Sequence, residues 1–283
     1  METDKENFDQ QLNVFMQSLN AVVSTDDGQW TVKGFVDVYK NIYTISSDTK
    51  IVSKILEIHL MPRILEFAAQ NGYVVVLPAH QNYYPDLSFV NIKDERIKFA
   101  VDLKTTYRLL DYPGFCNGFT LGSHGEYFVN RSSRKNIQFP YKAYAGHYSL
   151  GIIYSRLSNS NDETNIHSIN DLHSITSVIG DFQFFVAEKW RIASDKSGSG
   201  NTANVGSIAK IEDIVAGNGV FSRLGEAWFD DYWMNYGRIS IKTASGATTK
   251  IRNLADFVAY RGGDASLIVP KARRYRAKRS EGL

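Results

Sequence analysis

The sequence predicts a single α/β domain, and three observations support this fold class. Apolar residues recur at helical spacing over residues 8–23, strand-like runs occupy 73–77 and 87–107, and no break in composition divides the chain. The 283 residues, 43% of them hydrophobic, can bury a core, which excludes global disorder. The formal net charge of +2 neither supports nor excludes DNA binding, because a local basic cleft can carry phosphate contacts.

The first half of the chain alternates helical and extended segments. Residues 8–23 predict a helix, and residues 30–45 alternate as strands. Residues 49–70 predict a second helix, with N-caps offered by residues 46–48 and a stop at Asn71-Gly72. Pro62 is expected to kink or split this helix. Its apolar face is expected to hold Ile51, Ile55, Ile58 and Leu65.

The second half predicts fewer regular elements. Residues 111–136 are rich in Gly, Ser, Asn and aromatic residues and predict irregular structure. Residues 147–156 and 182–193 predict strands, and residues 226–236 predict a helix. Ser207 is expected to cap a short helix after a glycine-rich loop. The tail Lys271–Arg279 is strongly basic, which is typical of a flexible phosphate-binding or solubilising end.

The compartment is predicted from cysteine usage and from the N-terminus. A single cysteine, Cys116, excludes an internal disulfide and a cysteine-based zinc site, and fits a reducing cytoplasm. The polar, acidic N-terminus shows no secretory signal, and no run approaches the ~18 apolar residues of a membrane helix. We therefore expect a soluble cytoplasmic protein without a membrane partner.

Two carboxylates and a lysine form the most informative motif, Pro85-Asp86 followed by Asp102-Leu103-Lys104. Side chains alternate along a strand, so Asp102 and Lys104 share one face, ~7 Å apart, and Val101 and Leu103 point to an apolar face. If the turn centres near Asp94-Glu95, Asp86 lies opposite about Leu103, although a one-residue slip would reverse its face.

This set of residues suits metal-assisted cleavage of a phosphodiester. Mg²⁺ prefers hard oxygen ligands and takes one or two carboxylates plus phosphate oxygens and water. A neighbouring ammonium stabilises developing negative charge, or orients or deprotonates the attacking water if its pKa is depressed. The alternative reading is an ordinary surface hairpin with an Asp/Lys pair, because Pro-Asp is also a common turn dipeptide.

Three further features are ambiguous from the sequence alone. Glu57 is either part of a solvated salt-bridge face with Lys50 and Lys54 or a third carboxylate for the metal. The loop at 198–204 is a flexible surface loop, a weak dinucleotide-binding fingerprint or a loop whose glycines and asparagines approach base edges. The residues before Asp86, which include Gln81 and Asn82, are a polar connection or a minor-groove contact.

Taken together, the chain resembles the EcoRV-type, dimeric type II restriction endonucleases of the PD-(D/E)xK superfamily. The resemblance rests on SDTK at 47–50, Glu57, QNYYPD at 81–86, DLKTTY at 102–107 and GSGNTANVGS at 198–207, in that order. YRG at 260–262 and DYWMNY at 231–236 extend it, so it covers roughly residues 40–262. Segment 111–131, Ala203 and the chain after Gly263 depart from the family pattern.

The resemblance implies a fold and a domain organisation. It implies a mixed central β-sheet flanked by helices, the restriction-endonuclease-like fold, with a small N-terminal dimerisation subdomain at 1–45. The catalytic and DNA-binding core would span 46–262, and 263–283 would be a basic C-terminal extension. A homodimer would match a palindromic site in double-stranded DNA.

The resemblance also implies roles for individual residues. Asp86, Asp102 and Glu57 would hold Mg²⁺, with Mn²⁺ as a substitute, and Lys104 would complete the catalytic set. DNA contacts would come from Lys50, Gln81, Asn82, Thr105, Thr106, Gly198, Ser199, Gly200, Asn201, Thr202 and Asn204.

The implied activity is that of a type II site-specific deoxyribonuclease of a prokaryotic cytoplasm, paired with a cognate DNA methyltransferase. It would leave 5′-phosphate and 3′-hydroxyl ends, blunt-cut at a GATATC-like site. Three alternatives stay open: a structure-specific repair or junction nuclease, a non-catalytic DNA-binding protein on the same fold, and a nucleotide-binding oxidoreductase.

Overall fold

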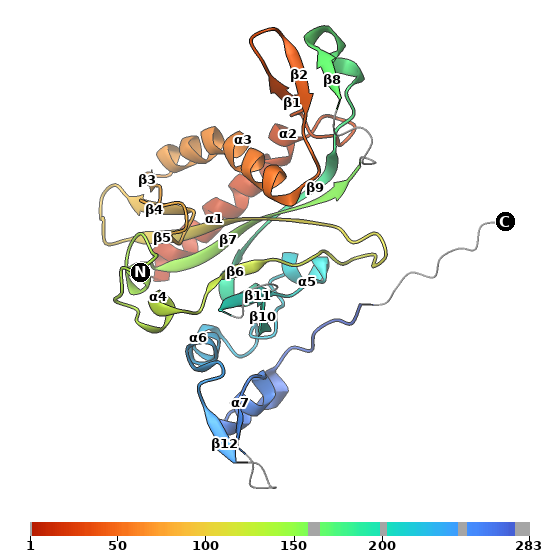
Figure 1. Ribbon diagram of the computed structural model, residues 1–283. Coiled ribbons are helices and arrows are strands. Elements are labelled where there is room, and N and C mark those ends of the chain that lie inside the picture. The colour runs from red at the N-terminus through yellow and green to blue at the C-terminus, as the bar shows by residue number, and fades with distance from the viewer. Residues whose placement is uncertain (1, 158–164, 199–202, 243–247, 275–283) are drawn as a thin grey trace, which may run out of the picture.

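A mixed five-stranded sheet forms the centre of the protein (Figure 1). The computed structural model describes residues 2–157, 165–198, 203–242 and 248–274. The strand order is β3-β4-β5-β7-β9, and only the β5–β7 pair is parallel. Its strands are β3 Tyr73–Val76, β4 Leu87–Asn91, β5 Lys98–Tyr107, β7 Gly146–Arg156 and β9 Ile179–Glu188. The predicted fold class, a mixed sheet flanked by helices, is confirmed.

The register of the β4–β5 hairpin differs by one residue from the predicted one. Leu87 pairs with Val101 and Ser88 with Ala100, so Asp86 lies beside Asp102 rather than opposite Leu103. The centre of the hairpin therefore lies at Asp94, half a residue before the predicted centre between Asp94 and Glu95. The strand predicted at 182–193 also ends sooner, at Glu188, where a 3₁₀ turn, η4 Lys189–Ile192, begins.

Helices α1, Glu2–Ser18, and α3, Thr49–Gln70, cover one face of this sheet (Figure 1). Phe8 stacks on Phe99 of β5 at 4.1 Å between ring centroids, in one core cluster with residues of α3. The first predicted helix begins earlier than residue 8 and is interrupted at Leu19, after which a short helix, α2 Asn20–Val23, follows.

Helix α3 buries a face that overlaps the predicted one only at Ile55. Ile51, Ile58 and Leu65 are exposed, and the buried residues are Val52, Ile55, Leu56, Leu60, Ile64, Phe67 and Ala68. These residues have the three- and four-residue spacing of a core-facing helix. Asp48 caps the helix by accepting from the N–H groups of Lys50 and Ile51. Pro62 does not split it, because the helix continues through that position.

The opposite face of the sheet is covered by a second layer. It contains β6 Thr120–Ser123, β10 Ala193–Ser197 and β11 Asn204–Ser207, in the order β10-β11-β6, with helices α4 Glu126–Val129, α5 Ile211–Val215 and α6 Glu226–Asn235. Residues 111–136 are therefore not wholly irregular. Ser207 ends β11 and does not cap a helix, because α5 begins after Lys210.

Because of this second layer, β5 is buried on both faces. Phe99, Val101 and Leu103 pack under α1 and α3, and Ala100 packs into the second core cluster on the other face. The reading of a surface hairpin with one solvated face is wrong. The face that carries Ala100 is covered by aromatic residues from distant segments, among them Tyr127, Tyr141 and Phe185. The sequence of the hairpin alone does not predict this cover.

Smaller elements lie at the two ends of the molecule (Figure 1). A three-stranded sheet, β1-β2-β8, projects beyond α3 and is built from β1 Gly34–Val36, β2 Asn41–Thr44 and β8 Ile166–Ser168, followed by η3 Ile169–Ser174. The other end holds β12 Ser240–Lys242, β13 Thr248–Lys250, α7 Leu254–Tyr260 and η5 Ala265–Leu267. A further 3₁₀ turn, η1, spans Tyr141–Ala143. None of the helices in the described ranges is long and apolar enough to cross a membrane.

Gly151 of β7 gives a stability prediction. It pairs with Lys104 on one side and with Phe185 on the other, and a Cβ at this position would lie 2.0 Å from two atoms of the Phe185 ring. We expect Gly151→Ala to lower the free energy of unfolding by about 1–3 kcal/mol through overpacking. Urea melts of both proteins measure it, and identical midpoints would show that the ring moves aside at no cost.

Candidate active site

Asp86, Asp102 and Lys104 meet where the β4–β5 hairpin opens. The N–H of Asp86 donates to Asp102 Oδ1 at 3.1 Å, and Asp86 Oδ2 accepts from the N–H of Leu103 at 2.8 Å. Lys104 Nζ lies 2.9 Å from Asp102 Oδ2 and 4.0 Å from Asp86 Oδ2. The structure therefore brings the three residues of the sequence motif into one cluster.

The cluster is electrostatically strained by its two carboxylates. Burial, together with the charge of Asp102, raises the pKa of Asp86 to about 6, and Lys104 only partly offsets this. A divalent cation placed between the two carboxylates would relieve their repulsion. The raised pKa of Asp86 therefore reflects its burial beside a second carboxylate, a position that a bound cation would stabilise in the charged form.

Lys104 is held as an ammonium ion. Burial alone would lower the pKa of Lys104, but the charges of Asp102 and Asp86 outweigh this effect and raise the pKa above its ordinary value. A lysine acts as a general base only if its pKa is depressed. Of the roles open from the sequence, this favours charge stabilisation and orientation of water by Lys104 over proton abstraction.

Glu57 lies across a cleft from Asp86. The cleft has a volume of about 450 Å³ and is lined by Glu57, Asp86, Gln81, Lys54, Ile58, Met61, Leu77, Pro78 and Leu87. Glu57 Oε2 is paired with Lys54 Nζ at 2.6 Å, as the salt-bridge reading of this helix face predicts. The salt-bridge reading of Glu57 is therefore confirmed. Glu57 faces the same cleft as Asp86, but in the described part of the chain it does not converge with Asp86 and Asp102 on one metal position as a third ligand would.

The cleft entrance is formed by the loop before Asp86. Gln81 lines the cleft, and Gln81 and Asn82 are both exposed. The loop is anchored below by Gln138, whose side-chain oxygen accepts from the N–H of Ala79 at 2.8 Å. Two amide side chains are thus free to meet a ligand beside the carboxylates.

The glycine-asparagine loop sits at the end of the β10–β11 hairpin. Gly198 N–H donates to the Asn204 carbonyl, which closes the hairpin, and Asn204 pairs with Ser123 of β6. A Cβ at Gly198 would lie 2.6 Å from Thr120 Cγ2, so this glycine is required by packing against β6. Ser199, Gly200, Asn201 and Thr202 lie outside the described residues.

The remaining predicted DNA contacts divide into accessible and buried positions. Lys50 is exposed in the first turn of α3, and Thr105 is partly exposed on β5 directly after Lys104. Thr106 is only 3% exposed, and its hydroxyl donates to the Gly118 carbonyl at 3.4 Å. Lys50 and Thr105 are accessible enough to contact DNA without a change in conformation, whereas the buried position of Thr106 indicates a packing role.

The two aspartates fit a magnesium ion better than a metal held wholly by protein. No group of three or more His, Cys, Asp or Glu side chains in the described part of the chain converges on a metal-sized position. Mg²⁺ usually takes only one or two carboxylates and completes its shell with water and phosphate oxygens. Asp86 and Asp102 supply that number, and the oxygen donors are of the kind Mg²⁺ prefers.

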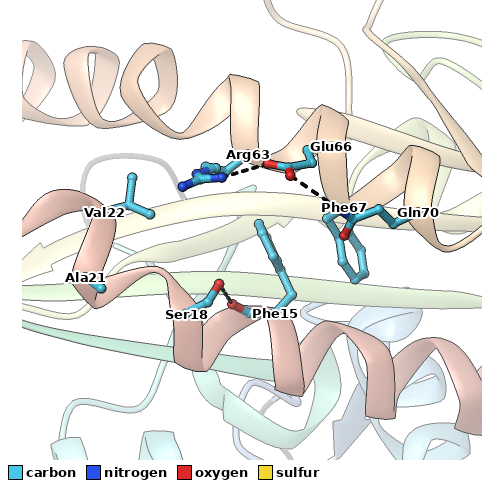
Figure 2. A pocket seen from close by; sticks show the side chains of 8 residues that line it. All are labelled: Phe15, Ser18, Ala21, Val22, Arg63, Glu66, Phe67 and Gln70. Carbon is cyan, nitrogen blue, oxygen red and sulfur yellow. Dashed lines mark hydrogen bonds and ion pairs between the residues drawn. The ribbon is translucent and has the colours of Figure 1, made fainter.

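A second groove, of about 520 Å³, lies between α1–α2 and α3 and shares no residue with the carboxylate cleft (Figure 2). Its walls carry the Phe15–Phe67 stack and the Arg63–Glu66 ion pair, which lies on one helix and is half-exposed. The groove holds no paired carboxylates, so its size alone does not make it a catalytic site.

Sequence reasoning missed the buried polar layer beneath the carboxylates. The Tyr84 hydroxyl bonds His147 Nδ1 at 2.9 Å, and the His147 ring stacks on Tyr141 at 3.7 Å. Lys189 lies in the same layer and is 3% exposed. One sequence signal points to Lys189: the charged pair Glu188-Lys189 follows an apolar strand, at the position where β9 ends. This signal is weak, because charged pairs at strand ends are usually solvated.

A mixed sheet that presents two aspartates and a lysine at a hairpin opening, with an amide-rich loop over the cleft, defines a nuclease of the PD-(D/E)xK type. The profile of the family described as Restriction endonuclease EcoRV matches residues 26–262. The Type II restriction enzyme EcoRV of Escherichia coli is 36% identical over 216 residues, which is 76% of this chain and 86% of that protein. The chain belongs to the EcoRV restriction endonuclease family.

Family membership establishes the coarse activity. The protein is a DNA-binding hydrolase, a restriction endonuclease that cuts DNA sequence-specifically. The match leaves the chain after residue 262 unassigned.

Proposed function

We propose that the protein is a Mg²⁺-dependent type II enzyme that cuts both strands of a short palindromic DNA site, leaving blunt 5′-phosphate and 3′-hydroxyl ends. The observation that carries this proposal is the contact of Asp86, Asp102 and Lys104 at one hairpin opening. Mn²⁺ is expected to replace Mg²⁺, because it accepts the same oxygen ligands.

The residues divide the work of hydrolysis. When bound, the metal lowers the pKa of a water and neutralises charge at the phosphate. Asp86 and Asp102 hold it there, and Glu57 faces the same cleft from α3 as an accessory acid. Water attacks phosphorus in line and gives up one proton to the surrounding solvent as the new P–O bond forms. The bond to the 3′ oxygen breaks, and that oxygen takes a proton from solvent, so the protons balance. The Lys104 ammonium stabilises the charge that develops on the phosphate.

Site recognition is assigned to two loops. Gln81 and Asn82 are exposed beside the carboxylates, which suits contact with the minor groove. The loop that contains Ser199, Gly200, Asn201 and Thr202, flanked by Gly198 and Asn204, is proposed to read the major groove, where Asn bonds adenine. Lys50 and Thr105 would add phosphate contacts. The similarity of residues 198–202 to the recognition loop of the EcoRV family is the basis for proposing a GATATC-like site.

The projecting β1-β2-β8 sheet supports a homodimer. Phe35, Tyr43 and Ile166 are cross-strand partners in one row, and they are exposed by 56%, 43% and 63%. Val38 and Tyr39 in the β1–β2 turn are more exposed still. A contiguous exposed apolar row indicates an interface, and a second copy of the chain matches a two-fold symmetric DNA site.

A charge in this row is expected to separate the subunits. Phe35→Lys combined with Ile166→Lys should convert the protein to a monomer and abolish concerted double-strand cleavage, because two ammonium groups cannot be buried unpaired. Sedimentation velocity and a plasmid assay measure both effects. Val74→Lys, at an exposed position of the edge strand β3, serves as the control. A dimer that survives the double substitution would place the interface elsewhere.

The cellular setting follows from the activity. We propose that the enzyme works in a prokaryotic cytoplasm beside a DNA methyltransferase that protects the same sequence, since an unprotected host genome would be cut.

Incubation with supercoiled plasmid tests the metal requirement. Protein treated with EDTA should leave the plasmid intact, and added Mg²⁺ should produce a discrete set of linear fragments. Cleavage that persists in EDTA, or no cleavage at any Mg²⁺ or Mn²⁺ concentration, would contradict the proposal.

A further inference from the structure

Lys189 is a buried lysine at the end of the central sheet. It follows β9 directly, in the first position of η4, and is 3% exposed. In the described part of the chain its Nζ has no hydrogen-bond partner. Burial of an ammonium ion costs several kcal/mol unless its surroundings offset part of that cost.

Aromatic rings form a cage around this ammonium group. Nζ lies 5.0 Å from the centroid of Tyr84, 5.3 Å from Phe128 and 5.7 Å from Tyr141. Gly122 lies on another side of the ammonium group. A Cβ at this position would come within 3.4 Å of Nζ, so the absence of a side chain leaves room for the lysine. Rings at these distances attract a cation through their faces, and do so more strongly when water is excluded. The three rings therefore offset part of the cost of burying this charge.

The cage lies directly behind the catalytic carboxylates. Tyr84 is two residues before Asp86, and Ala187, two residues before Lys189, lies in one cross-strand row with Ser149 and Asp102. Burial lowers the pKa of Lys189 to about 7, and the charge of Asp102 opposes this shift, whereas Lys104 acts in the same direction as burial. Asp102 thus pairs directly with Lys104 at the cleft, whereas its charge acts on Lys189 without a hydrogen bond or ion pair between the two.

We propose that Lys189 is a positioning residue of the metal site, whose buried positive charge opposes a divalent cation on Asp86 and Asp102 and so weakens metal binding to the free enzyme. The inference rests on the proposed metal-dependent function. Phosphate bound in the cleft would add negative charge and restore the affinity, so Lys189 makes metal binding depend on DNA.

Mn²⁺ binding to the DNA-free protein, followed by electron paramagnetic resonance at pH 6.5, tests this role without measuring cleavage. Lys189→Met removes the charge but keeps the aliphatic stem, and should lower the Mn²⁺ dissociation constant severalfold by removing repulsion. Lys104→Met should lower it further, because that ammonium is 2.9 Å from Asp102. Lys98→Met, on β5 but over the Phe139 ring, is the control and should leave it unchanged.

The outcomes separate the inference from the proposed function. If the unmodified protein and Lys104→Met both fail to bind Mn²⁺, the metal site itself is refuted. If Lys104→Met binds more tightly and Lys189→Met binds as the unmodified protein does, only the role of Lys189 is refuted. Lys189→Gln is measured as a second uncharged variant, and failure of both variants to fold would assign Lys189 to folding alone and overturn the proposal.

Discussion

Replacing Lys104 with methionine is expected to reduce DNA cleavage on the order of 10³-fold, the scale found when one group that stabilises transition-state charge is removed. The ammonium of Lys104 lies within 4.0 Å of both aspartates, and its raised pKa keeps it charged at neutral pH. Methionine keeps most of the side-chain volume, so the half-buried position should stay packed. Single-turnover cleavage with saturating enzyme measures the effect.

Lys98→Met is the matched control for this experiment. Lys98 lies on β5, six positions before Lys104, and its Nζ faces the Phe139 ring at 5.2 Å. It should cut at the rate of the unmodified protein. Both variants should bind cognate DNA in Ca²⁺, because the proposed recognition loops are unchanged. A Lys104→Met enzyme that cuts within tenfold of the unmodified protein would remove Lys104 from the catalytic set.

Replacing Asp86 with asparagine should abolish cleavage and, without metal, stabilise the protein above pH 6. The pKa of Asp86 is raised from 3.8 to about 6 in the folded state, mainly by burial. A raised carboxyl pKa means that the folded state keeps its proton at pH values where the unfolded chain has lost it. The cost to stability therefore builds up between pH 3.8 and about 6, is complete above about 6, and disappears well below 3.8. Because the side chain is 35% exposed, the gain is discounted to about 1 kcal/mol.

Urea melts in EDTA at pH 8 and pH 3 measure this difference. Asp86→Asn should be more stable than the unmodified protein at pH 8 and nearly equal to it at pH 3. Asp94→Asn is the control with opposite sign, because hydrogen bonds from Arg96 lower the pKa of Asp94 to about 2. That variant should lose stability at pH 8. A loss of stability in Asp86→Asn at pH 8 would show that the two carboxylates do not repel each other in the free protein.

The sequence was most informative where the local pattern decides the structure. Strand alternation predicted that Asp102 and Lys104 share a face, and hairpin counting brought Asp86 near them with an error of one residue. The error arose because the turn centre was inferred from residue type alone. Register depends on pairing along the whole hairpin, in which Phe89 and Phe99 are matched in the core.

Prediction failed where distant segments decide the environment. The face of α3 was misassigned because Ile51 and Ile58 are as apolar as the residues that α3 buries, and only the sheet beneath it distinguishes them. The cage around Lys189 draws on Tyr84, Phe128 and Tyr141, which are separated by long stretches of chain. No local sequence pattern predicts that these three rings meet around one lysine, since each ring alone is typical of an ordinary core residue.

Sequencing the ends of plasmid fragments produced with Mg²⁺ tests the central claim, that the hairpin cuts phosphate at a site chosen by the two loops. We predict that every end reads into the same short palindrome, with both strands cut at its centre. Ends scattered through the plasmid, or clustered at branched or mismatched DNA whatever the sequence, would contradict this account.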